Sequence, residues 1–144
     1  MVVVLDTNVF VAALLGPRGA SRSVLRACLE CRLQPLMGET LFREYESLLS
    51  REPLFRACRL DARQRDTLLN AFLSVCRWTT IYYGWRPNLR DEADNHLVEL
   101  AVAGGASVII TKNVRDFRGA ELHFPGLRTL SPEDILKEAQ EWPR

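Results

Sequence analysis

The stretch MVVVLDTNVF, residues 1–10, decides the fold class and raises the first question about function. Val2–Leu5 is an uninterrupted apolar run, which is typical of a strand buried on both faces of a parallel sheet. The run ends at once on Asp6, Thr7 and Asn8. A strand can simply stop at polar residues, but the same pattern fits a carboxylate at the mouth of a site. These two interpretations are distinguished by whether other residues in the chain could form a site together with Asp6.

The rest of the chain alternates between strand-like and helix-like segments. Strands are expected at QPLMG (34–38), WTTIYYGW (78–85), SVIIT (107–111) and 127–130. Helices are expected from Ser21 or Ser23 to about residue 33, over 41–50 behind a Thr40 cap, from an Asp61 cap to residue 76, over 95–105, and after a Ser131 cap. This alternation predicts an α/β fold with a mostly parallel sheet. A length of 144 residues suits one domain, 1–144.

Composition and charge narrow the class of protein. The net charge is +1, so the chain has no overall basic field for nucleic acid. No apolar run approaches the ~20 residues of a membrane span, and strand-like residues begin where a signal peptide would lie. We therefore expect a cytoplasmic protein with no membrane partner. Cys28 and Cys31 resemble half of a zinc or redox motif, but nothing completes it, so we expect core thiols.

Two apolar strands bring polar residues to the same edge of the predicted sheet. Open parallel sheets place their functional sites outside the C-terminal ends of the strands. Asp6 follows the first strand, and Thr111 ends a later one and leads through Lys112 and Asn113 to Asp116. Asp6 and Asp116 are therefore candidates for one site, although Asp116 alone fits an ordinary turn residue.

Two predicted helices carry an acid on an otherwise apolar face. Glu44 lies one turn before Leu48 on that face, where a glutamate is costly unless something pairs with it. Asp94 continues the apolar stripe of its helix toward the N-terminus, and Asp91 lies one turn earlier. Taken singly, Glu44 fits a boundary residue, Asp94 a helix-start acid and Asp91 an N-cap.

The four acids together favour a metal site. Asp6, Glu44, Asp94 and Asp116 come from separate elements, and two of them interrupt apolar stripes. Carboxylates that converge repel one another unless a cation neutralises them. Oxygen-rich octahedral coordination suits Mg²⁺ or Mn²⁺.

The chain resembles PIN domains on LDTNV (5–9), LFREYESLL (41–49), DEADNHLVELAVAGGASVIIT (91–111) and TKNVRDF (111–117). These are metal-dependent ribonuclease domains, and many are the toxin halves of bacterial toxin–antitoxin pairs. The resemblance implies a three-layer α/β/α sandwich and a Mg²⁺- or Mn²⁺-dependent endoribonuclease. It also implies a VapC-like toxin that forms homodimers and is inhibited by an antitoxin segment across its acidic groove.

The resemblance also assigns site residues. The family's acids fall on Asp6, Glu44 and Asp94, and its fourth region falls on TKNVRDF. Many members carry aspartate where this chain has Asn113, which leaves Asp116 as the remaining acid and fewer charges for a second metal. Asp6, Asp94 and Asp116 are the expected metal ligands, and Glu44 is expected to complete the shell or orient water.

Neighbouring residues take supporting roles in this hypothesis. Candidates for contacts to the acids or to phosphate are Thr7, Asn8, Asp91, Thr111 and Asn113. Arg90, Lys112 and Arg115 flank these segments and could hold an RNA backbone, although solvated surface charge is the simpler interpretation for each one alone.

Other classes with acids at strand ends fit the chain less well. Haloacid-dehalogenase-like phosphatases need a second aspartate two residues after the first, and Asn8 stands there. Response-regulator receivers need an aspartate at a mid-chain strand end, but none lies between Asp6 and Asp61. The stronger alternative is a catalytically weak or inactive PIN-like module that binds RNA or protein. Asn113 favours this alternative, and the four acids argue against it.

The middle third of the chain is rich in apolar residues. Phe55 and Phe72 stand out, with Leu54, Leu60 and Leu68 near them. These residues either fill the core or form an exposed patch, and exposed patches commonly mark interfaces. We expect a homodimer built from roughly Leu41–Cys76, with the acidic pockets open to RNA.

Overall fold

Five parallel strands form the centre of the computed structural model, which describes all residues except 17–18, 82–94, 120–123 and 143–144. The strands are β1 (Val2–Leu5), β2 (Gln34–Met37), β3 (Arg77–Trp78), β4 (Val108–Ile110) and β5 (Arg128–Leu130). Their order in the sheet is β3-β2-β1-β4-β5, so the first strand of the sequence is central.

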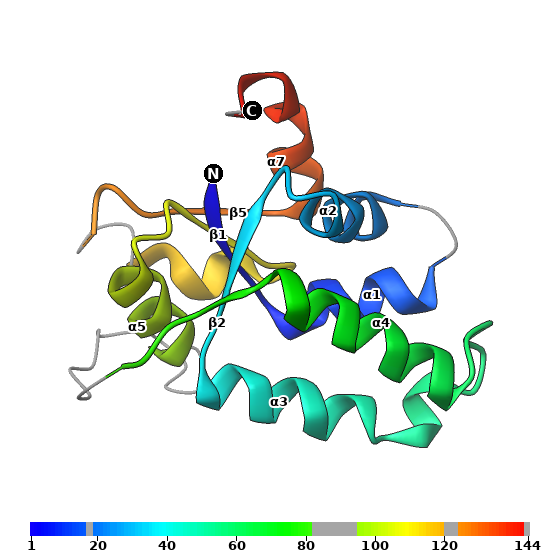
Figure 1. The fold of residues 1–144 in the computed structure, drawn as a ribbon. Coiled ribbons are helices and arrows are strands. Elements are labelled where there is room, and N and C mark those ends of the chain that lie inside the picture. Colours follow the sequence, from blue (N-terminus) through cyan, green and yellow to red (C-terminus); the bar gives the residue numbers. More distant parts are fainter. Residues whose placement is uncertain (17–18, 82–94, 120–123, 143–144) are drawn as a thin grey trace.

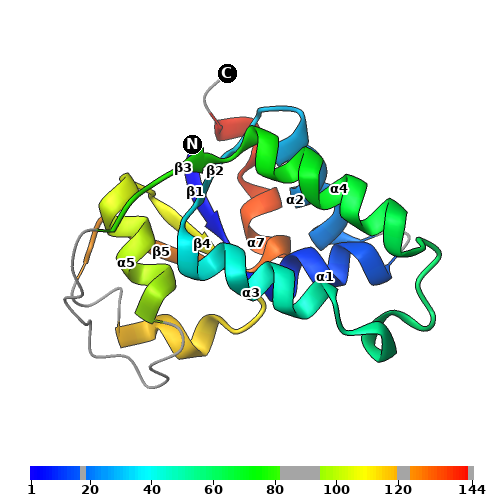
Figure 2. The same cartoon turned by 60° about the horizontal axis from the view of Figure 1, so that its bottom comes forward.

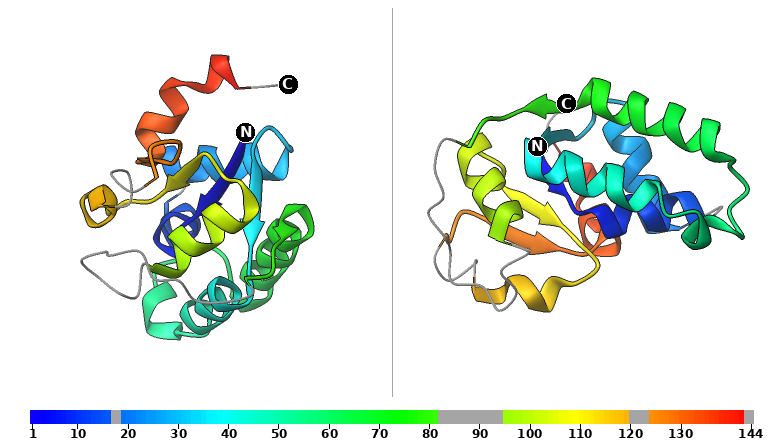
Figure 3. Two further views of the ribbon diagram at one scale, coloured as in Figure 1. Left: turned by 90° about the vertical axis from the view of Figure 1, so that its left-hand side faces the viewer. Right: turned by 90° about the horizontal axis from the view of Figure 1, so that it is seen from below.

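Helices cover both faces of the sheet, which confirms the predicted three-layer α/β/α sandwich (Figures 1 and 3). They are α1 (Thr7–Leu15), α2 (Ala20–Leu29), α3 (Glu39–Leu49), α4 (Ala62–Val75), α5 (Asn95–Gly104) and α7 (Pro132–Lys137). Short 3₁₀ turns are η1 (Glu52–Phe55), η3 (Val114–Phe117) and η4 (Ala139–Glu141). Helix α5 lies on one face, and α1 and α2 lie on the other, where α7 packs against α2. Helices α3 and α4 run in opposite directions and are joined through η1 (Figure 2).

An aromatic cluster fixes α3 against the end of β1. The rings of Phe10, Tyr45 and Phe72, from α1, α3 and α4, lie 5.3 to 5.8 Å apart between centroids. The Tyr45 hydroxyl donates a 2.7 Å hydrogen bond to the carbonyl oxygen of Leu5. Because Leu5 directly precedes Asp6, this buried bond sets the position of α3 relative to the first acid.

Several predicted boundaries are confirmed, and others are wrong. Asp61 and Ser131 cap α4 and α7 as predicted. Helix α1 was not predicted, and Gly38 instead of Thr40 is the N-cap of α3. Helix α2 follows Gly19, whose φ of 132° favours glycine, and it ends at Leu29.

Strand β3 is shorter than predicted. It covers two residues instead of 78–85, and residues 82–85 of that segment lie outside the described ranges. No helix among the described residues is long and apolar enough to cross a membrane.

The predicted apolar patch of the middle third is largely core. Phe55 and Phe72 are 3% and 0% exposed, whereas Leu54 is 40% exposed. The cysteine prediction is likewise only half right. Cys28 is buried, and burial raises the pKa of its thiol to about 12, but Cys31 is exposed.

Candidate active site

Asp6 lies where the ends of two adjacent strands meet. The backbone N–H of Asp6 donates a 3.0 Å hydrogen bond to the carbonyl oxygen of Ile110, which continues the pairing of β1 with β4. The backbone N–H of Thr111 donates a 3.0 Å hydrogen bond to the carbonyl oxygen of Leu130. The Thr111 hydroxyl then donates a 2.8 Å hydrogen bond to Asp6 Oδ2. The prediction that the two strand ends bring Asp6 and Thr111 together is therefore confirmed by geometry.

The Asp6 carboxylate is buried beside another acid. Only 6% of the residue is exposed, and burial raises its pKa above the ordinary value. The hydrogen bond from Thr111 lowers the pKa, while the charge of Glu44 raises it further. The net effect is a raised pKa, so a positive partner beside Asp6 would favour its ionised form.

Thr7 connects Asp6 with Glu44. The Thr7 hydroxyl lies 2.8 Å from Glu44 Oε1 and 3.4 Å from Asp6 Oδ1. A hydroxyl has one proton, and the shorter distance shows that it is donated to Glu44. The structure therefore directs Glu44 of α3 toward Asp6, as its place on an apolar helix face suggested.

His96 is a site residue that the sequence reasoning missed. Its Nε2 lies 2.9 Å from Glu44 Oε2, and this hydrogen bond is the main reason why the pKa of Glu44 is lowered, with Thr7 contributing. Its Nδ1 is buried and has no hydrogen-bond partner among the described residues. His96 stands near the start of α5, which places this helix end beside Glu44. In the sequence, the feature that could have indicated this role is that His96 lies two residues after Asp94.

Asn8 joins the two loops that follow β1 and β4. Its Nδ2 lies 3.3 Å from Asp6 Oδ2 and 3.4 Å from the Thr111 hydroxyl, and its Oδ1 accepts from the backbone N–H of Lys112 at 3.2 Å. The backbone N–H of Asn113 donates to the Thr111 hydroxyl at 3.1 Å. These bonds hold the TKN segment against Asp6.

The remaining predicted residues are less closely tied to this network. Asp116 lies half-buried in η3, and within the described residues no hydrogen bond or ion pair links its side chain to Asp6 or Glu44. Arg115 is exposed. Asp94, Asp91 and Arg90 lie outside the described ranges. Convergence of Asp94 and Asp116 with Asp6 thus stays a prediction.

The donor atoms at this edge fit a hard cation. Asp6 and Glu44 supply carboxylate oxygens, the ligands that Mg²⁺ and Mn²⁺ prefer. Within the part of the chain that the structure describes, no three carboxylate, thiol or imidazole side chains form a metal-holding group. Asp94, the other principal ligand that the sequence predicts, directly precedes α5 in the sequence and lies outside the described ranges.

Fold and site together define an α/β domain with a buried acidic site at the ends of parallel strands. The family described as PIN domain matches residues 2–115 of the chain. The protein belongs to the PIN domain family, whose members are generally nucleases that use divalent metal ions.

A solved structure shares this fold. The chain is similar to one in the crystal structure of VapBC2 from Rickettsia felis bound to a DNA fragment from their promoter, with a TM-score of 0.60 and 18% sequence identity. The similarity covers 91% of this chain and 98% of that chain. No curated protein sequence matches the chain.

Proposed function

We propose that this PIN domain is a Mg²⁺- or Mn²⁺-dependent endoribonuclease. The observation that carries the proposal is the buried Asp6 carboxylate, whose pKa is raised by burial and by the neighbouring Glu44. A cation beside Asp6 would offset both the burial of this carboxylate and the negative charge of Glu44. A bound divalent ion would activate water and offset charge on the phosphoryl oxygens.

The proposal assigns a separate role to each residue of the site. Asp6 and Asp94 are the principal metal ligands, and Asp116 completes the shell. Glu44, held by His96 and Thr7, accepts a proton from water or orients it. Thr111 and Asn8 fix the Asp6 carboxylate.

The proposed biological setting is a cytoplasmic toxin–antitoxin pair. Support comes from the fold shared with a chain of the VapBC2 structure. On this proposal the protein is a homodimer that cleaves RNA, and a cognate antitoxin protein inhibits it. Arg90, Lys112 and Arg115 would contact the RNA backbone.

A catalytically weak binding module is the second candidate. Asn113 favours it, because this exposed side chain is neutral and its backbone N–H is what contacts the Thr111 hydroxyl. RNA binding without hydrolysis would identify this function.

An RNA hydrolysis assay distinguishes the two candidates. Single-stranded and structured RNA are incubated with the protein and Mg²⁺ or Mn²⁺, and then with excess EDTA. We expect cleavage that EDTA abolishes and that Asp6→Asn reduces at least about 100-fold, the scale of losing one group that stabilises the transition state. Cleavage that survives Asp6→Asn would contradict the proposal.

A further inference from the structure

A small pocket of about 140 Å³ lies between α1, α2 and α4, away from the acidic site. Helix α2 packs against both α1 and α4 (Figure 2). Leu25 is buried in the pocket, whereas Leu29, Leu60 and Leu68 line it and stay half-buried, so apolar surface is still open to solvent. The volume is below the roughly 300–1,000 Å³ of sites for drug-sized ligands, so the pocket suits one apolar side chain and not a whole small molecule.

Two arginines make this pocket positively charged. Arg22 and Arg26 are exposed on α2 and line the pocket. They are four residues apart on one side of the helix, which puts their Cβ atoms about 5–6 Å apart. Within the described residues neither arginine forms an ion pair, and no acid lines the pocket. Two guanidinium groups beside apolar surface fit two carboxylates that flank an apolar side chain.

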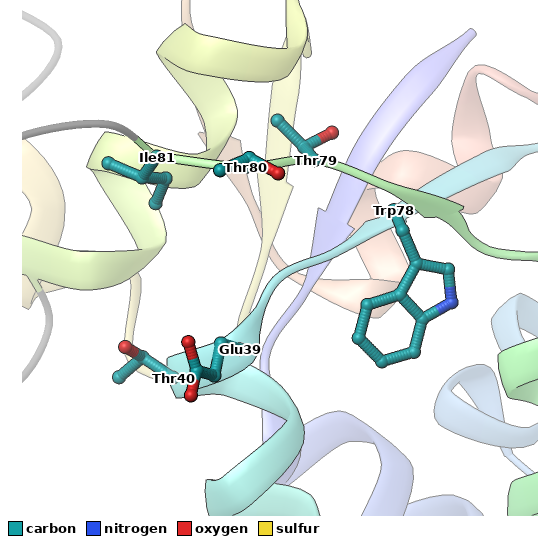
Figure 4. A pocket seen from close by; sticks show the side chains of 6 residues that line it. All are labelled: Glu39, Thr40, Trp78, Thr79, Thr80 and Ile81. Atoms are coloured by element: carbon teal, nitrogen blue, oxygen red, sulfur yellow. The ribbon is translucent and has the colours of Figure 1, made fainter.

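Other concave places on the molecule carry the opposite charge. Figure 4 shows Glu39 at the pocket between β3 and the start of α3. The groove between α3 and α4 is lined by Glu46 and Asp66, which form no ion pair with a described residue. No described arginine or lysine lines either place, and the site at Asp6 and Glu44 is acidic too. An acidic partner is therefore repelled from these three places and attracted to the pocket at α2.

We propose that the pocket at α2 docks an acidic amphipathic helix of a partner protein. One leucine-sized side chain of that helix enters among the leucines, and two carboxylates one turn apart pair with Arg22 and Arg26. A helix is the matching form, because acids four positions apart on a helix have the same spacing as the two arginines. Phosphate contacts need cations but no apolar floor, so the leucines favour a protein partner over nucleic acid.

A partner docked in this pocket leaves the acidic site open. Ala13 is the α1 residue that lines the pocket, and it follows Thr7 by six positions, or about 9 Å along the helix. The pocket shares none of its lining residues with the hydrogen-bond network around Asp6. The partner therefore tethers the protein without covering Asp6, and the inference goes beyond the proposed nuclease function.

The test titrates a fluorescent helical peptide with the full chain and follows anisotropy. The peptide has about 15 residues, because shorter isolated helices are marginal in water. It carries two glutamates one turn apart, with a leucine beside them on the same face. We expect saturable binding that Arg22→Gln/Arg26→Gln weakens about 3- to 30-fold, the equivalent of two exposed ion pairs. Glutamine in place of the two peptide glutamates should weaken binding as much, and alanine in place of the leucine should weaken it too.

Arg51→Gln/Arg56→Gln is the matched control, because it removes the same charge from exposed residues that flank η1. This control should bind the peptide like the wild type. The variant Arg22→Glu/Arg26→Glu should reverse the preference and bind a peptide that has lysines in place of the glutamates. NMR of the wild-type complex should show the largest shift changes on α2 and α4, and not at Thr7 or Thr111.

Three results would overturn the proposal. The first is no binding of the glutamate peptide at millimolar concentrations, and the second is an equal loss of affinity in the Arg51→Gln/Arg56→Gln control. The third is a set of NMR changes centred on Thr7 and Thr111, which would put the peptide on the acidic site. An oligoribonucleotide or an anionic lipid vesicle that displaces the peptide would assign the arginines to that partner and also refute the proposal. Hydrolysis enters none of these measurements, so a lack of nuclease activity would refute the proposed function alone.

Discussion

At the scale of single residues, Asp6 and Glu44 experience opposite environments although Thr7 connects them. Burial raises the pKa of Asp6, whereas the hydrogen bond from His96 lowers that of Glu44. Separated pKa values are common where two acids take different roles in a reaction. Here the buried acid suits a metal ligand, and the hydrogen-bonded acid suits an ionised group that handles water.

Asp6→Asn should stabilise the metal-free protein while abolishing hydrolysis. Folding raises the pKa of Asp6, so the ionised carboxylate is less favourable in the folded protein than in the unfolded chain. The free energy of unfolding therefore falls as pH rises through the folded-state pKa of Asp6. Asparagine has no charge to bury and keeps an oxygen for Thr111. At pH 7 in EDTA we expect the free energy of unfolding to rise by about 1 kcal/mol. Urea melts should show this gain vanishing below the ordinary carboxyl pKa of 3.8. A loss at pH 7 would mean that the Asp6 charge is structurally required.

His96→Ala should raise the pKa of Glu44, because the hydrogen bond that mainly lowers it is lost. A lowered carboxyl pKa contributes stability above its unfolded value, and this stability is lost as pH falls through the folded value. The variant should therefore be less stable at pH 7 but not in acid. The expected loss is at most about 1 kcal/mol, because 38% of the Glu44 side chain is exposed and screened. NMR titration of the Glu44 carboxyl tests the shift, and His96→Gln, which keeps a donor, should partly restore it.

At the scale of elements, the sequence predicted those with clear periodicity and caps. Asp61 and Gln64 form a reciprocal capping box at the start of α4, with bonds of 2.8 and 3.0 Å. Helix α1, in contrast, reads TNVFVAALL and is apolar all round, so it has no polar face to reveal a helical period. The aromatic, β-branched residues after β3 suggested a long strand, although only two residues of β3 pair with β2. The strand propensity of a residue describes its local preference, whereas the pairing of a strand depends on neighbouring strands that are distant in sequence.

Asp61→Ala should destabilise the fold without changing the chemistry. It removes the side-chain acceptor for the Gln64 N–H, and losing such a cap costs about 1 kcal/mol. Thermal melts measure the loss, and Asp66→Ala, an exposed position on the same helix, is the control. RNA hydrolysis at 25 °C should match the wild type. A specific loss of activity in a folded variant would show that α4 belongs to the site.

At the scale of the whole molecule, the strand order creates the site. Because β1 is central, Asp6 meets Thr111 although 105 positions separate them. Sequence reasoning reached this pair because parallel strands end at a common edge. It missed His96, whose role depends on how α5 packs beside α3. It also left open whether Phe55 and Phe72 fill the core or form an exposed patch, and the fold uses both as core.

The proposed homodimer should now be sought at the exposed part of the middle third. Leu54 remains exposed there, whereas a charge at Phe72 would disrupt the core. We predict a dimer by light scattering at tens of micromolar, and we expect Leu54→Glu to shift it toward monomer with an unchanged melting temperature. A wild-type monomer would refute the dimer, and a Leu54→Glu dimer would place the interface elsewhere.

Calorimetric titration with Mn²⁺ tests the central claim most directly, namely that Asp6 and Asp94 hold one metal site. We predict saturable binding to the wild type that is lost in Asp6→Asn and in Asp94→Asn, while both variants remain folded. Asp66→Asn, an exposed acid on α4, should bind like the wild type. Unchanged Mn²⁺ binding by Asp6→Asn or Asp94→Asn would contradict the account.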